Sequence, residues 1–117
     1  MGARLTYPER PVILLSGDGA FTFNVGDLEC AARQRLPFVA IVADDQAWGI
    51  TKIGHEQQFS VPISSTLGPI EFAKLAKALG AKGLTARTEA EIGEALREAL
   101  SQPEVTVIHV PIVGGNP

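Results

Sequence analysis

The sequence predicts an α/β fold, a three-layer sandwich with a mainly parallel sheet. Apolar runs of strand length alternate with stretches whose apolar residues recur at helical spacing. The runs are continuously apolar, which is typical of parallel strands covered on both faces. With 117 residues, the chain is long enough for one domain with a modest core. This alternation favours helices on both faces of the sheet.

The first half of the chain predicts a strand–helix–strand unit. Residues 1–11 are short and polar and contain two prolines, so we expect a surface connection there. Residues 12–16 form the first apolar run, and residues 38–43 form the second. Between them we expect a helix capped by Asn24. It ends at the Leu36-Pro37 pair, because the residue before a proline avoids the helical conformation.

The second half predicts two further helix–strand units. We expect a short helix to begin at residues 48–52, whereas residues 55–67 have no clear period and predict a long loop. The remaining elements follow in order: a helix from Pro69 to Gly80, a strand at 81–85, a helix from the Thr88–Glu91 capping box to residue 100, a strand at 105–110 and a tail at 114–117.

The composition argues against several classes of protein. At 45% hydrophobic and 20% charged residues the chain is globular, and a net charge of −3 without a basic block argues against nucleic-acid binding. No apolar run has the length of a membrane span, and residues 1–6 lack an apolar signal core, so we expect a cytoplasmic protein. The single cysteine, Cys30, is interpreted as a small core residue.

Acidic residues follow the first two strands. Gly17-Asp18-Gly19 follows the first, and Asp44-Asp45 follows the second. Carboxyl ends of parallel strands share one edge of the sheet, where such folds bind ligands, so Asp18 and Asp45 can meet there. The glycines allow positive φ and close approach of a ligand to the backbone amides. Because carboxylate oxygens suit Mg²⁺, which bridges phosphates, this edge predicts a Mg²⁺-diphosphate site.

This two-part pattern resembles the thiamine diphosphate motif, in which Gly-Asp-Gly is followed after one helix–strand unit by, usually, Asn-Asn. Residues 17–49 are similar throughout to the acetolactate synthase and benzaldehyde lyase branch of that family. The resemblance implies that residues 1–117 are part of the C-terminal cofactor (PP) domain of a larger enzyme. The domain would lack its own N-terminal strand–helix unit.

The resemblance also implies the cofactors, thiamine diphosphate and Mg²⁺, and their site. The metal ligands would be the carboxylates of Asp18 and Asp45 and the carbonyl of Ala47, while Gly19 and Ala20 would offer amides to the diphosphate. Trp48 is expected to pack over the edge of the cofactor. The full expected cofactor-binding set is Gly17, Asp18, Gly19, Ala20, Asp45, Ala47, Trp48 and Gly49. No catalytic residue is assigned to this chain.

Two departures from the family pattern bear on cofactor affinity. Asp44-Asp45 replaces the usual amide pair, which places extra negative charge beside a diphosphate. Ala20 replaces a frequent serine and removes a hydroxyl contact. Both changes predict weaker binding of the cofactor.

The implied function is thiamine diphosphate-dependent carboligase, decarboxylase or lyase chemistry on 2-oxo acids. It would require a pyrimidine-binding domain, from the same or another chain, that carries an activating glutamate, so the isolated chain is expected to be inactive. The missing unit should expose apolar sheet surface and favour a homo-oligomer. Three alternatives stay open: a noncatalytic cofactor- or partner-binding module, a β-subunit of a 2-oxoacid:ferredoxin oxidoreductase, for which Cys30 offers no cluster ligand set, and a response-regulator-like acidic pocket.

Four other polar features have modest interpretations. We expect Asp44 to be solvated or to stabilise a turn, His109 to be structural, and His55 to be a solvated loop residue. Glu29 lies one helical turn before Arg33, which predicts either a surface ion pair or a buried carboxylate that positions the helix.

Overall fold

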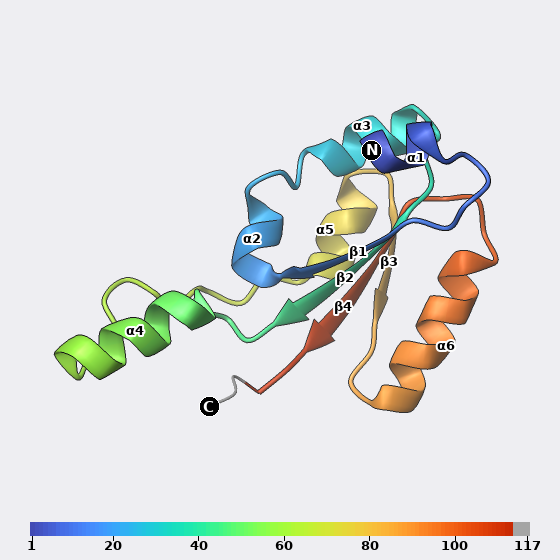
Figure 1. The fold of residues 1–117 in the computed structure, drawn as a ribbon. Coiled ribbons are helices and arrows are strands. Elements are labelled where there is room, and N and C mark those ends of the chain that lie inside the picture. Colours follow the sequence, from blue (N-terminus) through green and yellow to red (C-terminus); the bar gives the residue numbers. More distant parts are fainter. Residues whose placement is uncertain (114–117) are drawn as a thin grey trace.

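A computed structural model of the protein describes residues 1–113. Its centre is a sheet of four strands in the order β1-β2-β4-β3, shown in Figure 1. The strands are β1 (Ile13–Gly17), β2 (Val39–Asp44), β3 (Lys82–Thr85) and β4 (Thr106–Pro111). All three pairings are parallel. The predicted α/β fold with a parallel sheet is therefore confirmed.

Helices cover both faces of this sheet and make the three layers of the fold. They are α1 (Gly2–Thr6), α2 (Asp18–Thr22), α3 (Asp27–Arg33), α4 (Gly49–Phe59), α5 (Phe72–Ala78) and α6 (Glu89–Leu100). In Figure 1, α3 and α5 lie on one side of the sheet, α6 lies on the other, and α4 extends away from the body. No helix in the described part of the chain is long and apolar enough to cross a membrane.

Two hydrophobic clusters correspond to the two faces of the sheet. Successive side chains of a strand point to opposite faces, so Ala40 and Val42 of β2 pack with α2, α3 and α5. Val39 instead joins Ile108 of β4 and the buried alanines of α6. The central strands β2 and β4 therefore match the expectation that both faces are covered.

Helix ends follow the predicted chemistry at two places. Thr88 caps α6, because its side chain accepts a hydrogen bond from the Glu91 amide at 3.2 Å. Gly80 ends α5 with a φ of +81°, and Ala81 donates to the Ala76 carbonyl as in a Schellman motif. The predicted N-cap at Thr88 and the glycine stop are confirmed, whereas the Glu91 carboxylate accepts the amide of Arg87 at 2.6 Å in place of the Thr88 amide that a capping box requires.

Several predicted boundaries differ from the structure. Residues 1–11 contain α1, whose Ala3, Arg4 and Leu5 are good helix formers. The helix expected from Asn24 begins instead at Asp27, whose amide bonds the Asn24 carbonyl in a preceding turn. The helix expected from Pro69 begins at Phe72. The tail at residues 114–117 lies outside the described residues.

The largest differences concern β1 and α4. The expectation that β1 is covered on both faces is wrong, because it is an edge strand whose Ile13, Leu14 and Leu15 are 47%, 44% and 74% exposed. This surface is the exposed apolar sheet surface that we expected. Helix α4 continues to Phe59 through much of the predicted loop, and its sequence shows no period because it buries no residue.

Gly83 of β3 tests how closely α5 packs on the sheet. A Cβ at Gly83 would overlap the carbonyl oxygen of Ala73, a backbone atom that cannot move independently. Gly83→Ala should therefore lower the free energy of unfolding by about 3 kcal/mol or more, as severe overpacking does. The matched control is Gly93→Ala inside α6, where a Cβ has room and should stabilise the helix by up to about 1 kcal/mol. Denaturant unfolding measures both, and equal effects would contradict the packing argument.

Candidate active-site edge

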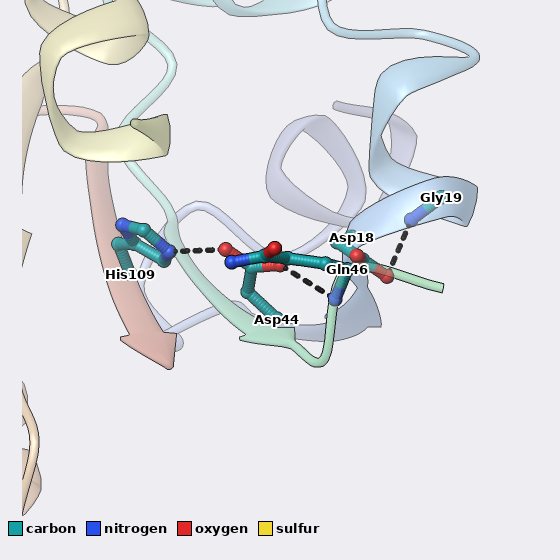
Figure 2. Close-up of polar contacts among 5 residues, drawn as sticks. All are labelled: Asp18, Gly19, Asp44, Gln46 and His109. Carbon is teal, nitrogen blue, oxygen red and sulfur yellow. Dashed lines mark hydrogen bonds and ion pairs between the residues drawn. The ribbon is translucent and has the colours of Figure 1, made fainter. Parts of the chain in front are cut away.

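The ends of β1 and β2 lie side by side at one edge of the sheet. Gly17, the last residue of β1, pairs in register with Ala43, so Asp18 and Asp44 both stand where the strands end. Burial most of all, and then the nearby carboxylates of Asp44 and Asp45, raise the pKa of the Asp18 carboxyl. Figure 2 shows Asp18 and Asp44 together at this edge. The structure thus confirms that the two predicted acidic turns meet.

Asp18 is a buried carboxyl in the first turn of α2. Asp18 is only 4% exposed, and its Oδ1 atom accepts a hydrogen bond from the Gly19 amide at 2.8 Å. Burial raises the pKa of Asp18 most, the Gly19 hydrogen bond opposes the change, and the neighbouring carboxylates of Asp44 and Asp45 raise the pKa further. Negative charge is therefore concentrated at this edge, and a cation would relieve it.

The two glycines around Asp18 have different roles from those predicted. Neither has positive φ, and Gly17 has ordinary extended angles of −78° and 161°. A Cβ on Gly19 would lie 3.0 Å from the Trp48 ring, so the glycine allows the indole to pack on the start of α2. A Cβ on Gly17 would meet no atom within 4 Å, so Gly17 leaves open space at the edge. The expectation of positive φ is wrong, whereas room for close approach is present.

The loop after β2 presents the other expected ligands. Trp48 donates its amide to the Ser65 carbonyl at 2.8 Å, and Leu67 donates to the Gln46 carbonyl at 2.7 Å. These bonds flank the antiparallel pair Ala47 and Thr66, so the amide and carbonyl of Ala47 point away from Thr66. Within residues 1–113, no N–H donates to the Ala47 carbonyl, although Ala47 is only 6% exposed. A buried carbonyl without a donor suits a cation.

Asp45 and Trp48 come from the same loop as Ala47. The Asp45 Oδ2 atom lies against Gly49, since a Cβ there would be 3.2 Å from it. The Trp48 ring packs on Phe23 with centroids 5.3 Å apart, which agrees with its interpretation as a packing residue. Ala20, the remaining member of the expected set, is exposed on α2.

These donors fit Mg²⁺ as a shared ion and do not form a cage made by the protein alone. In the described part of the chain, no group of three or more His, Cys, Asp or Glu side chains is arranged to hold a metal. The expected set contains only two carboxylates, with a backbone carbonyl as the third ligand. Mg²⁺ is commonly held in this way, by one or two carboxylates together with phosphate oxygens and waters.

Asp44 and His109 form a buried pair that the sequence analysis did not predict. His109 Nε2 lies 2.7 Å from Asp44 Oδ2, and the residues are 8% and 6% exposed (Figure 2). Asp44 Oδ1 also accepts the Gln46 amide at 3.1 Å. Asp44 therefore stabilises a turn, which is one of the two roles expected for it. The other, that it is solvated, is wrong. His109 is structural as expected.

A signal for this pair was present but incomplete. Asp44 ends β2 and His109 lies two residues before the end of β4, yet β3 lies between these strands in the sequence, so only the sheet order makes the two residues neighbours. Ser65 was also missed. It is 1% exposed, supports Trp48 through its carbonyl, and has a hydroxyl without a partner among the described residues.

The remaining polar candidates lie away from this edge or on its outer helix. Glu29 and Arg33 form an exposed ion pair at 2.9 Å, so the buried-carboxylate alternative is wrong. His55 lies within α4, where its Nδ1 accepts the Ile63 amide at 3.3 Å, so it is not a loop residue. Cys30 is half-buried on α3.

The chain is similar in sequence and fold to known proteins. The family model described as the thiamine pyrophosphate enzyme, C-terminal TPP binding domain, matches residues 1–110. Acetolactate synthase of Bacillus subtilis is 30% identical over 112 residues, which cover 96% of this chain and 20% of that protein. Benzoylformate decarboxylase from Polynucleobacter necessarius superposes with a TM-score of 0.88 at 32% identity, covering 99% of this chain and 22% of that one. A thiamine diphosphate-dependent 4-hydroxybenzoylformate decarboxylase of Rhodococcus jostii superposes with a TM-score of 0.91 at 27% identity over the same shares.

The raised pKa of Asp18 predicts that this carboxylate costs stability in the absence of a cation. The folded chain holds a proton on Asp18 at pH values where the unfolded chain, with a pKa near 3.8, has lost it. The contribution of Asp18 to stability therefore falls as pH rises above that value. Asp18→Asn removes this loss, so the variant should gain stability relative to the wild type between pH 4 and pH 7.

Denaturant unfolding without divalent cations at both pH values measures this difference. Asp27→Asn is the control, because Asp27 is exposed in the first turn of α3, where the helix dipole favours a negative charge. It should not stabilise the chain at pH 7. A constant difference between Asp18→Asn and the wild type across this range would contradict the argument.

Proposed function

This chain belongs to the thiamine pyrophosphate enzymes, as their C-terminal TPP binding domain, and on that premise we propose that it binds the Mg²⁺-diphosphate end of thiamine diphosphate. The observation that carries the proposal is the register of β1 with β2, which brings the buried Asp18 carboxyl and the acidic turn after β2 to one edge of the sheet. Asp18 and Asp45 supply carboxylates, and Ala47 supplies a buried carbonyl to which no described N–H donates. Bound Mg²⁺ would neutralise the charge that now raises the pKa of Asp18.

The first turn of α2 would receive the diphosphate. Gly17 leaves open space there, and the first amides of a helix are free to donate to an anion. The Gly19 amide now bonds Asp18 Oδ1, so a diphosphate oxygen would share or replace that bond. Ala20 offers its amide without a side-chain hydroxyl. The indole of Trp48, packed on Gly19, would border the cofactor.

The chain spans about a fifth of the length of the relatives it matches. We therefore propose, for the whole protein, a carboligase, decarboxylase or lyase reaction on 2-oxo acids. The names acetolactate synthase and benzoylformate decarboxylase support this class of reaction. When bound, thiamine diphosphate supplies the electron sink for breaking or forming a carbon–carbon bond. The residues of this chain bind and orient its diphosphate end, and the isolated chain is expected not to turn over substrate.

The partner in this proposal is a pyrimidine-binding domain of the same or another chain, within a homo-oligomer. The exposed side of β1 supports an interface, since Ile13, Leu14 and Leu15 present apolar side chains there. A hollow of about 450 Å³ adjoins them, lined partly by Ala20 and Phe21 of α2. An apolar, hollowed surface next to the cofactor edge is the kind of surface that a second domain covers.

Calorimetric titration with thiamine diphosphate, with and without Mg²⁺, tests the site. We expect Mg²⁺-dependent binding by the folded wild-type chain. Asp45→Ala removes a ligand and should weaken binding at least as much as the roughly 10- to 100-fold typical of residues that only support a ligand. Asp45→Asn keeps an oxygen ligand and removes one negative charge, so it should bind at least as tightly as the wild type. Asp27→Ala, outside the site, should have no effect.

Three outcomes separate the explanations. Binding that is independent of Mg²⁺, or unaffected by Asp45→Ala, would refute the assigned ligands. Binding by Asp45→Asn but not by the wild type would retain the ligand position and identify the extra charge as the cause of weakness. Absence of binding by both, in samples that circular dichroism shows to be folded, would refute cofactor binding by this chain alone.

A further inference from the structure

We infer that His109 is a positioning residue for the metal-binding loop, which it holds in place through Asp44. This inference rests on the proposed function, because it concerns the loop that presents Asp45 and Ala47. The contacts form one chain: His109 Nε2 lies 2.7 Å from Asp44 Oδ2, and Asp44 Oδ1 accepts the Gln46 amide at 3.1 Å. Each oxygen of the Asp44 carboxylate therefore has its own partner, one on β4 and one in the loop (Figure 2).

The orientation of the His109 ring is itself fixed by packing. His109 on β4 pairs in register with Val42 on β2. Its side chain therefore points to the face that α5 covers. There its ring meets the Phe72 ring edge-on, with centroids 5.3 Å apart. Phe72 meets Phe21 of α2 in the same way at 5.8 Å. The aromatic contacts thus connect the imidazole to the helix that begins with Asp18.

The loop needs such a support because its backbone is strained. Gln46 has a φ of +57°, a left-handed conformation that costs free energy for a residue with a side chain. From the outer side, the loop is held by the bonds to Ser65 and Leu67. From the side of the sheet, it is held by Asp44, which closes the turn through the Gln46 amide.

Without His109, the Asp44 carboxylate would be buried with one oxygen unpaired. Such a group turns toward water or another donor, and either movement weakens its bond to Gln46. The following residues, Asp45 and Ala47, would then lose their fixed positions. The support does not require a charged imidazole, because Nε2–H is present both in the imidazolium and in one neutral tautomer.

Two substitutions at position 109 separate the hydrogen bond from the packing. His109→Phe keeps an aromatic ring against Phe72 but has no donor for Asp44. His109→Gln has an amide whose nitrogen reaches about as far as Nε2 and can donate to Asp44. We therefore expect the loop to lose its support in His109→Phe and to keep it in His109→Gln.

The first measurement needs no cofactor. Amide hydrogen exchange by NMR should show Gln46 exchanging about tenfold faster in His109→Phe and near the wild-type rate in His109→Gln. The Ala86 amide, which bonds the backbone carbonyl of residue 109 itself, is the internal control and should not change. Equal protection of Gln46 in wild type and His109→Phe would overturn the inference, whether or not the chain binds thiamine diphosphate.

The second measurement is the Mg²⁺ affinity in the presence of thiamine diphosphate. His109→Phe should weaken it about tenfold, within the range for residues that orient a metal ligand, and His109→Gln should restore it. A wild type that fails to bind would count against the proposed function, while the exchange result still decides the role of His109. Binding by His109→Phe that equals the wild type would overturn that role.

If His109→Phe does not fold, the same comparison can be made in the variant Asp44→Asn, which has no charge at position 44. In Asp44→Asn no buried charge can be left unpaired, and the side-chain amide at that position can still accept the Gln46 N–H while donating to His109. Adding His109→Phe to this variant should speed exchange at Gln46 relative to Asp44→Asn alone. Equal rates in the two variants would overturn the inference.

Discussion

The parallel pairing of β1 with β2 is the constraint on which the rest of the site depends. It places Gly17 beside Ala43, so the residues that follow each strand emerge at one edge. Pairing of β2 with β4 then brings His109 to the face and the end of the sheet where Asp44 stands. Neither contact is local in sequence. A slip of β4 by one residue relative to β2 would turn His109 to the face opposite Asp44 and separate the imidazole from the carboxylate.

Electrostatics explains why this edge is unstable by itself yet suited to a cation. Burial raises the pKa of Asp18 most, and the nearby carboxylates of Asp44 and Asp45 raise it further. Asp44 has His109 as its partner, whereas the Asp18 carboxyl accepts the Gly19 amide and lies beside the Asp44 carboxylate. Asp44 therefore belongs to the framework of the loop, and the charges of Asp18 and Asp45 remain to be balanced. In the proposed function, Mg²⁺ held by these carboxylates would balance them.

Elements that are determined by residues close in sequence could be predicted. Examples are the N-cap at Thr88, the stop at Gly80 and the apolar runs of β2 and β4. The meeting of the two acidic turns at one edge followed from the polarity of parallel strands. Features set by distant contacts could not be predicted in this way. The exposure of β1 depends on its place at the edge, α4 buries no face, and the Asp44–His109 pair depends on the order β2-β4-β3.

The two acidic residues after β2 consequently differ in kind, although they are adjacent and chemically identical. The alternation of side chains along β2 turns Asp44 inward, next to Val42 on the covered face, where a carboxylate must find a hydrogen-bonding partner. Asp45 follows beyond the strand and lies against Gly49, half-buried, where an ion can reach it. Replacing an amide pair by two carboxylates therefore raises two separate problems. The histidine on β4 solves the first within the fold by pairing with Asp44, and in the proposed function a bound cation would solve the second.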